Sequence, residues 1–581
     1  MFLRKAKVKS GNIQLAIMRS YRDEHGKPKQ KIVQYIGTLK ELEKDYDDPI
    51  AHFTQVAKQM TEEQKQASRK VRISLSLDDR LLGSEDAESG ITASNTRKNL
   101  GYAVFSKIYH ELELDYFLDN RRRYTKSGVN LEAIFRMLVY LRLLSPGSKK
   151  NSFENKGLLF DKMDFSLEDI YRALSFFNDN SREMMQSIHK RICKNYGRDT
   201  SLVYYDVTNY YFEIDDEDQL RKKGVSKEHR PDPIIQMGLF MDTDGIPVSY
   251  GLFEGNKLDK QTMIPMIHNV RSDYQLDRVI YVADKGMMCG NNIRHILSKG
   301  DGYVISYSIR CADKAFKSYV LQGGYRANKD GSLVKSRIYP REIIVTDLKG
   351  KRSRLQIHEK QVVFYSPKYA AKAKADRAKA VAKAHVLARS PGSYTRATSY
   401  GAAKYVRNIA FDRKTGEILE SVKSLLEFDD AKLAEEEKYD GFYAIVSSEL
   451  DCPADKIIRI YRGLWKIEET FKITKSDLGS RPVFLSTEEH IRAHFLICFV
   501  ALVIARILEV KILNGQFGTS EILRSIRRYS CSRLEENYYL FDYYDEIIGK
   551  LGDVMGIDYN RRYMTLNEIR KILGKTKQIE G

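Results

Sequence analysis

The sequence predicts an α/β protein whose central sheet has strands of mixed direction. Apolar runs at 201–206, 234–241, 247–253, 278–284 and 302–307 have the length and composition of buried strands. The first three follow one another directly, with an Asp-Gly turn at 242–246, whereas helical patterns at 259–272 and 290–299 separate the last three. Strands joined by short turns pair antiparallel and strands joined by helices pair parallel, so both directions are expected in one sheet.

The N-terminal part of the chain predicts a small β-hairpin and a helix. Apolar and polar residues alternate over 12–36 around a polar turn at 23–28, which is typical of a hairpin with a basic face. Residues 39–70 are polar and helical in pattern, and 74–95 have the Ser, Asp and Gly content of a linker. We therefore expect an N-terminal module over 1–70.

Residues 97–198 predict a helical domain. Candidate helices are 98–118, 130–144, 166–177 and 181–195, and Ser166 is a plausible cap. Arg121, Arg122 and Arg123 lie between the first two helices. Such a cluster either binds DNA phosphates or belongs to a solvated loop, and the sequence leaves both interpretations open.

The rest of the chain predicts a core in two parts. The first part covers 199–310, and 311–454 interrupts it with further strands and a basic helix at 368–389, which is either a solvated surface or an arm that follows phosphates. The second part, 455–515, is helical and ends in an apolar helix at 491–511. A C-terminal helical region is expected at 516–581.

Composition favours a protein that binds a polyanion. The 581 residues exceed one ordinary core, and 97 Lys and Arg against 78 Asp and Glu give a net charge of +19. The six cysteines are scattered and contain no Cys-x-x-Cys pair, which argues against a disulfide framework and against a zinc site. We expect free thiols in a reducing compartment. The N-terminus has no signal-peptide pattern, and the longest apolar run, 495–505, is too short to span a bilayer. We expect a soluble intracellular protein.

Three acidic residues stand in unusual surroundings. Asp206 lies in an aromatic and β-branched strand, and Asp284 ends another apolar strand. Glu468 shares a helical face with Tyr461 and Trp465, among large apolar groups. Taken singly, each has an ordinary explanation, as a turn residue or as an exposed partner of a lysine one turn away. Together, carboxylates from two strands and a helix predict a site for divalent cations such as Mg²⁺.

The spacing around Glu468 matches a known signature. Tyr461, Glu468 and Lys475 fit the pattern Tyr, two residues, Arg, three residues, Glu, six residues, Lys, although Leu464 occupies the Arg position and Arg462 is only close to it. The chain resembles DDE transposases of bacterial insertion sequences, in the branch named for this Tyr-Arg-Glu-Lys signature. The resemblance also includes Tyr-Asp-Val-Thr at 205–208, Val-Ala-Asp-Lys-Gly at 282–286 and Arg-Pro-Val-Phe at 481–484.

The resemblance implies a ribonuclease-H-like catalytic core interrupted by a β-rich insertion, and a helical N-terminal DNA-binding region over 97–198. Asp206, Asp284 and Glu468 would be the catalytic, metal-binding triad for two Mg²⁺ ions, for which Mn²⁺ substitutes. Trp465 would either stack on a base or lie in the core, and the core is the more common place for a tryptophan. The residues expected at the DNA are Tyr461, Arg462, Trp465, Lys475, Lys227, His229, Arg230, Arg121, Arg122 and Arg123.

The leading hypothesis is a DNA transposase that cleaves the ends of an insertion sequence and joins the freed 3′-hydroxyl to target DNA. Its partners would be double-stranded DNA with terminal inverted repeats, target DNA and a second copy of the chain, in the bacterial cytoplasm and at the nucleoid. Two alternatives are a nuclease on the same fold that cuts without joining and a DNA-binding derivative without catalysis.

Overall fold

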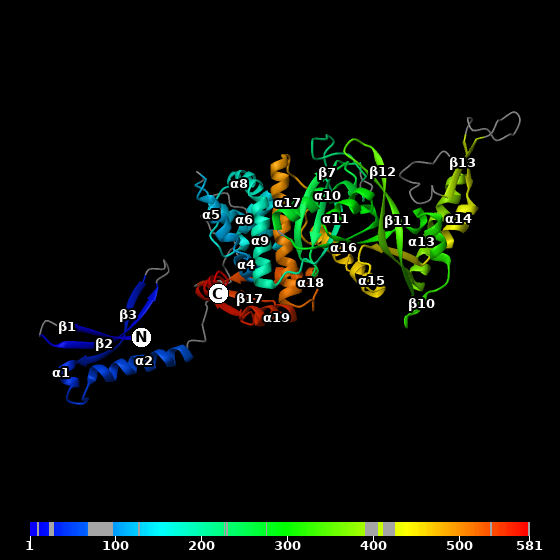
Figure 1. Cartoon of the computed structure of the whole chain (residues 1–581). Coiled ribbons are helices and arrows are strands. Elements are labelled where there is room, and N and C mark those ends of the chain that lie inside the picture. The colour runs from blue at the N-terminus through cyan, green and yellow to red at the C-terminus, as the bar shows by residue number, and fades with distance from the viewer. Residues whose placement is uncertain are drawn as a thin grey trace. The chain divides into compact units, whose positions relative to one another are not determined.

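The computed structural model describes residues 1–7, 11–22, 28–67, 97–125, 128–225, 227, 231–274, 276–389, 405–410, 424–534 and 537–578. The chain divides into two compact units (Figure 1). The first comprises Met1–Arg97, Ser532–Leu540 and Tyr563–Leu566, and the second comprises Lys98–Cys531, Phe541–Arg562 and Asn567–Gly581. The predicted linker at 74–95 lies outside the described residues.

The N-terminal segment of the first unit is a three-stranded antiparallel sheet with two helices. The strands β1 (Phe2–Lys7), β2 (Ile13–Arg22) and β3 (Pro28–Thr38) pair in the order β1-β2-β3. Leu15 and Ile17 on β2 are buried, as is Ala57 on the covering helix α2 (Pro49–Ala67). The predicted hairpin is confirmed, and it gains β1 and the short helix α1 (Leu39–Leu42).

The helical block that follows β4 (Arg97–Asn99) contains the predicted helices over 130–144, 166–177 and 181–195 and an additional short helix at 149–154. It differs from the prediction over 98–118, where helix begins only at Ala103. Glu113 has φ of 51°, in the left-handed region, and it divides the predicted helix 98–118 in two. Ser166 caps α8 as expected, because its side chain accepts a hydrogen bond from the Asp169 amide. The helices are α4 (Ala103–Glu111), α5 (Leu114–Arg122), α6 (Leu131–Leu144), α7 (Lys149–Glu154), α8 (Leu167–Asp179) and α9 (Ser181–Tyr196).

Among the described residues, nine strands form one mixed sheet in the order β10-β11-β12-β15-β9-β8-β5-β6-β7. The five predicted strands are all present, and β5 extends five residues beyond its predicted end. Strands β5, β8 and β9 run parallel, and the other pairs are antiparallel. The predicted strands are β5 (Leu202–Tyr211), β6 (Ile234–Met241), β7 (Pro247–Glu254), β8 (Ile280–Ala283) and β9 (Gly302–Tyr307).

Most strands of the segment 311–454 extend the core sheet, whereas its strands at 406–410 and 424–428 pair with each other in a separate two-stranded sheet. Strand β15 (Phe442–Ser447) pairs with β9 on one side and with β12 (Arg352–Tyr365) on the other. The predicted basic helix is α13 (Pro367–Arg389). The other elements are α12 (Lys314–Leu321), β10 (Arg326–Ala327), β11 (Leu333–Thr346), β13 (Val406–Ala410), β14 (Ser424–Phe428) and α14 (Asp430–Glu437).

Helices cover both faces of the sheet. On one face, Val203, Tyr205 and Val207 of β5 belong to a buried cluster with residues of α10 (Met263–Tyr274) and α11 (Gly290–Ser298). Because side chains alternate along a strand, Tyr204 and Asp206 belong to the opposite face. There α15 (Ala454–Arg462) packs near β9 and β15, and α16 (Trp465–Lys472) packs on β5.

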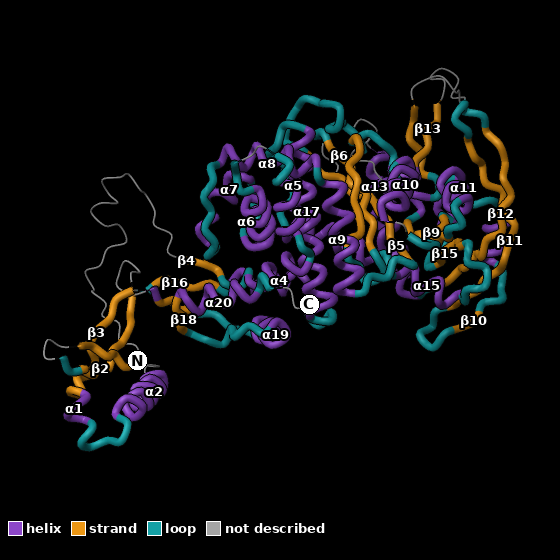
Figure 2. The backbone as a smooth tube through the Cα atoms, turned by 60° about the vertical axis from the view of Figure 1, so that its left-hand side comes forward, coloured by secondary structure: helices purple, strands orange, loops and turns teal. Residues whose placement is uncertain are grey.

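Helix α17 (Glu488–Ile507) joins the helical block to the sheet. It packs against α6 and α8 and also against the edge strand β7, and Figures 1 and 2 show it between these parts. The predicted apolar run lies in α17 and is buried, and a π-helical turn over Leu508–Ile512 follows. Within the described part of the chain, no helix has both the length and the apolar content to cross a bilayer.

The C-terminal region is mixed and not purely helical as predicted. It contains the helices α18 (Thr519–Arg528), α19 (Glu546–Met555) and α20 (Leu566–Lys575) and three short strands. Those strands are β16 (Ser530–Arg533), β17 (Tyr538–Phe541) and β18 (Tyr563–Thr565), of which β17 and β18 pair antiparallel.

Candidate active site

The strand register places Asp206 beside Asp284. Tyr205 of β5 pairs with Ala283 of β8, so the next residue along each strand direction is an aspartate. In turn Ala283 pairs with Ile305 of β9, and the residue after Ile305 is Ser306. Asp206, Asp284 and Ser306 therefore form one row across three parallel strands.

Asp206 is a carboxylate with a raised pKa. Burial, with smaller contributions from the negative charges of Asp284 and Asp259, raises the pKa to about 6. The Lys227 ammonium and a hydrogen bond from the Val207 amide oppose this shift without cancelling it. Burial thus destabilises the ionised carboxylate by more than the Lys227 ammonium and the Val207 amide stabilise it.

Asp284 is held by hydroxyl groups on one of its oxygens. Ser306 Oγ donates to Asp284 Oδ1 at 2.6 Å, and Tyr461 Oη donates to the same oxygen at 3.2 Å. Tyr461 Oη also lies 3.0 Å from Tyr443 Oη, and the Lys285 amide donates to Ser306 Oγ at 2.8 Å. Two donors on Oδ1 fix the orientation of the carboxylate and leave Oδ2 directed elsewhere.

Lys227 and Lys475 approach the strand that carries Asp206. The Lys227 ammonium donates a hydrogen bond to the Val207 carbonyl. Burial, with a smaller contribution from the Lys227 charge, lowers the pKa of Lys475 to about 8, and Lys475 Nζ lies 5.4 Å from the centre of the Tyr210 ring. A cavity of about 400 Å³ opens beside Val207, and Lys227, Asp259 and Lys260 contribute to its wall.

Helix α16 carries Glu468 across the face of β5 on which Asp206 lies. Gly463, just before the helix, is packed so closely on Tyr204 that a side chain there would collide with the tyrosine hydroxyl. Lys475, after the helix, reaches Tyr210. Asp206 lies between these two contacts along β5, as Glu468 lies between them along the helix.

The surroundings of Glu468 differ from the prediction. The single helical face expected over 461–475 is interrupted, because α15 ends at Arg462, α16 begins at Trp465 and a π-helical turn covers Ile473–Asp477. Glu468 is exposed, and Trp465 is 56% exposed, so Trp465 does not lie in the core, which was the more common of its two expected places. Within the described residues, no three His, Cys, Asp or Glu side chains lie close enough together to hold one metal ion.

Trp465 and Glu468 line a large aromatic cavity of about 790 Å³. Arg462 is exposed at the wall of this cavity. Hydrogen bonds from Ser332 lower the pKa of Asp330, and the charge of Arg462 makes a smaller contribution in the same direction. Leu464 is 7% exposed, and a guanidinium in its place would be buried. The aromatic residues of the wall are Phe364, Tyr369, Tyr439, Phe442, Tyr443, Tyr461 and Trp465.

The remaining predicted DNA contacts are not part of this site. Arg121 and Arg122 end α5 and Arg123 follows it, in the helical block on the side of α17 opposite to the sheet (Figure 1). His229 and Arg230 lie outside the described residues. Ser306, Tyr443 and Asp259 were not predicted, and the only sequence signal for Ser306 is its position near the end of an apolar strand, as for Asp284.

The donor set suits a hard cation. Asp206 and Asp284 offer carboxylate oxygens, which Mg²⁺ and Mn²⁺ prefer, and no nitrogen or sulfur ligand accompanies them among the described residues. The raised pKa of Asp206 is the observation that favours a cation here, because a positive charge would offset both the burial and the repulsion from Asp284.

Two family models match the sequence. The transposase DDE domain matches residues 213–504, which is half of the chain, and the N-terminal domain of IS1634 family transposases matches residues 3–71. The first match contains Asp284 and Glu468 and begins seven residues after Asp206 (213 − 206 = 7). A comparison with curated proteins found no match.

Solved structures of transposases are distantly similar. A piggyBac transposase synaptic complex with hairpin DNA has 8% identity and a TM-score of 0.35, over 83% of this chain and 85% of that chain. A Mos1 transposase paired-end complex with the left transposon end has 10% identity and a TM-score of 0.14, over 31% and 60%. A Mos1 mariner paired-end complex with Mn has 12% identity and a TM-score of 0.13, over 43% and 67%.

Proposed function

Because the chain belongs to the transposase DDE-domain family and is therefore a DNA transposase, we propose that Asp206, Asp284 and Glu468 are its catalytic triad. The enzyme would cleave DNA at the ends of an insertion sequence and join the freed 3′-hydroxyl to target DNA. The observation that carries this proposal is the strand register, which sets Asp206 and Asp284 side by side beneath the helix of Glu468. It agrees with a ribonuclease-H-like core of the Tyr-Arg-Glu-Lys branch.

The carboxylates would hold the divalent cations. When bound, two Mg²⁺ ions, or Mn²⁺ in their place, would activate the attacking oxygen and stabilise the leaving oxygen of the scissile phosphate. Asp206 and Asp284 are already adjacent, and Glu468, which is exposed, would complete the triad when its side chain turns toward them. Ser306 and Tyr461 would keep Asp284 in one orientation throughout.

The groups around the triad would position DNA. Lys227, Lys475 and Arg462 would contact phosphates near the cut, whereas the contact of Tyr461 with Asp284 favours a role in orienting that carboxylate. Trp465, exposed in an aromatic cavity, would stack on a base. His229 and Arg230, the arginines at 121–123, the helical block over 97–198 and the basic helix α13 would add further contacts.

The biological setting follows from this reaction. The substrate would be double-stranded DNA with terminal inverted repeats, and target DNA would be the second substrate. We expect a homodimer on DNA, since two element ends are processed together, in the bacterial cytoplasm and at the nucleoid. The catalytic core, formed by residues 199–310 and 455–515, would carry out both end cleavage and joining to target DNA.

The test is Mg²⁺-dependent cleavage of labelled end DNA by Asp206→Ala, Asp284→Ala and Glu468→Ala. Each should lose cleavage by at least three orders of magnitude while retaining end binding. Glu469→Gln, on the same helix, is the matched control and should keep activity, because its partner Arg506 also pairs with Glu509. Retained cleavage in any of the three would remove that residue from the triad, and cut but unjoined products would identify a nuclease.

A further inference from the structure

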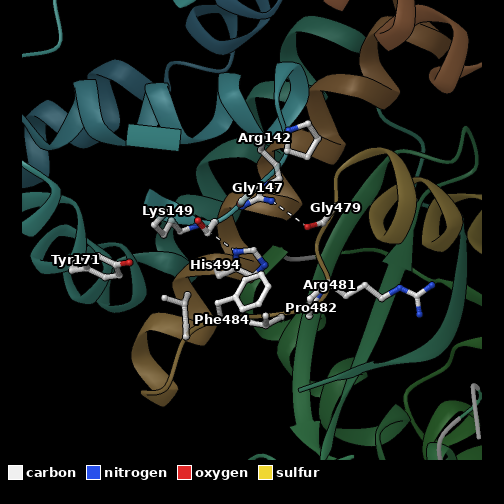
Figure 3. A pocket seen from close by; sticks show the side chains of 13 residues that line it. Arg142, Gly147, Lys149, Tyr171, Gly479, Arg481, Pro482, Phe484 and His494 are labelled. Carbon is white, nitrogen blue, oxygen red and sulfur yellow. Dashed lines mark hydrogen bonds between the residues drawn. The ribbon is translucent and has the colours of Figure 1, made fainter. Parts of the chain in front are cut away.

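A cavity with basic side chains lies apart from the triad, between the helical block and the loop after the Glu468 helix. It is a cavity of about 250 Å³ whose wall combines Lys149 at the start of α7, His494 of α17 and the loop from Gly479 to Leu485 (Figure 3). No aspartate or glutamate is among its described lining residues. We infer that this cavity binds a phosphate group through Lys149, and that the phosphate belongs to the backbone of the DNA substrate.

Lys149 is a buried ammonium with spare donors. The residue is 3% exposed, and its Nζ lies 3.2 Å from His494 Nδ1. His494 Nε2 faces the Ser480 carbonyl at 3.3 Å, so Nε2 carries the ring hydrogen and Nδ1 accepts from Lys149. The remaining two N–H groups of Lys149 have no hydrogen-bond acceptor among the described residues. Buried ammonium groups are normally paired, and an anion would supply the missing partner.

A second buried cation adds to the positive charge. Arg142 is 2% exposed and donates to the carbonyls of Gly147, Leu478 and Gly479, which fastens the two walls of the cavity together. These carbonyls carry no net charge, so the guanidinium charge is not neutralised by them. Burial, and then repulsion from Arg142, lower the pKa of Lys149 to about 7. An anion in the cavity would relieve that repulsion.

One wall of the cavity reaches the end of the strand that carries Asp206. The loop that forms its wall follows α16, and the Arg481 guanidinium, which points away from His494 in Figure 3, lies 5.8 Å from the centre of the Tyr211 ring at the end of β5. Asp206 and Tyr211 are five residues apart on that strand, or about 17 Å at about 3.3 Å per residue. The cavity lies beyond this end of the strand, so the bound phosphate would be several nucleotides from the scissile one.

The proposal rests on DNA being the substrate but not on the triad, so it is tested by binding without cleavage. Full-length protein is titrated with labelled end DNA in EDTA, and the slope of log K against log [salt] is measured. Lys149→Met should make that slope shallower by about 0.9, the value for one phosphate contact. Lys150→Met is the matched control, because Lys150 is the exposed neighbour with the same charge, and its slope should stay closer to that of the parent. An unchanged slope in Lys149→Met, or equal changes in both variants, would overturn the inference.

Two measurements on the parent protein stand even if Lys149→Met fails to fold. Replacing single phosphates of the end DNA by methylphosphonates should weaken binding most at one position away from the cut. The other possible ligand is free inorganic phosphate. If it binds in the cavity, it should raise the Tm of the protein in a saturable way, and by more than sulfate does at equal ionic strength. A rise with phosphate but no sensitive DNA position would mean that the cavity binds free phosphate, and the absence of both effects would refute the site.

Discussion

Replacing Asp206 with Asn should stabilise the metal-free protein at pH 8 while abolishing cleavage. The pKa of Asp206 is about 6 in the folded chain, whereas an ordinary aspartate titrates near 3.9. At about 1.36 kcal/mol per pH unit, the ionised carboxylate costs the folded state about 3 kcal/mol above pH 6. Asn has nearly the same shape and no charge, so the substitution removes that cost.

The direction in which stability changes with pH follows from proton binding. Between about pH 4 and pH 6 the folded state keeps the Asp206 proton that the unfolded state has lost, so stability falls as the pH rises through this window. The advantage of Asp206→Asn should therefore be complete at pH 8 and about half as large at pH 5. For a chain of this length, about 3 kcal/mol corresponds to a rise in Tm of about 2–3 °C.

The assay is thermal unfolding at pH 5 and pH 8, with and without Mg²⁺. Mg²⁺ should raise the Tm of the parent protein but not that of Asp206→Asn, since only the parent has the complete carboxylate pair. Asp161→Asn is the control, because Arg136 and the Tyr102 hydroxyl overcome the effect of burial and lower the pKa of Asp161, so its loss should destabilise. An Asp206→Asn protein no more stable than the parent at pH 8 would refute the reasoning.

Three other substitutions test the site and the core. Ser306→Ala should raise the Mg²⁺ concentration for half-maximal cleavage about tenfold, as loss of a group that orients a metal ligand commonly does, and Ser306→Thr should restore it. Trp465→Ala should weaken binding of DNA ends about tenfold in a fluorescence titration, whereas Trp465→Phe should bind nearly normally. Because the side chain is 56% exposed, the alanine variant should change the free energy of unfolding by less than about 0.5 kcal/mol. Arg136→Met should cost about 3–5 kcal/mol in urea unfolding, because it leaves the buried Glu132 carboxylate without its cation and Asp161 with only the more distant Lys577. Full stability would contradict that pairing.

The parts of the fold that depend on local pattern were predictable. The strands over 234–241 and 302–307 and the helix over 131–144 were anticipated to within a residue, because apolar runs and helical periodicity are local properties. The left-handed residue Glu113 has no such signal, since glutamate is an ordinary helix former. The pairing of β15 with β9 joins residues more than 130 positions apart, and no local pattern encodes it.

The candidate site was predictable in its residue types and less so in its geometry. Asp206 and Asp284 could be paired because their strands and order were evident, and the register brings them together. The exposure of Glu468 could not be anticipated, because it depends on the interruption of the helix after Arg462, and Gly463 alone does not predict a break. Lys149 and His494, 345 positions apart, meet because α7 and α17 both pack against α6 and α8.

Gly463 also determines how closely the helix of Glu468 can lie against the sheet. Because this residue has no side chain, the start of α16 lies directly against the ring of Tyr204, two positions before Asp206 on β5. Gly463, between α15 and α16, therefore allows the closest possible approach of α16, which carries Glu468, to β5, which carries Asp206. A single methyl group added there would separate Glu468 from the aspartates without altering any ionisable group. Catalytic rate in this protein is thus open to adjustment by a purely steric change, at a position with no chemistry of its own.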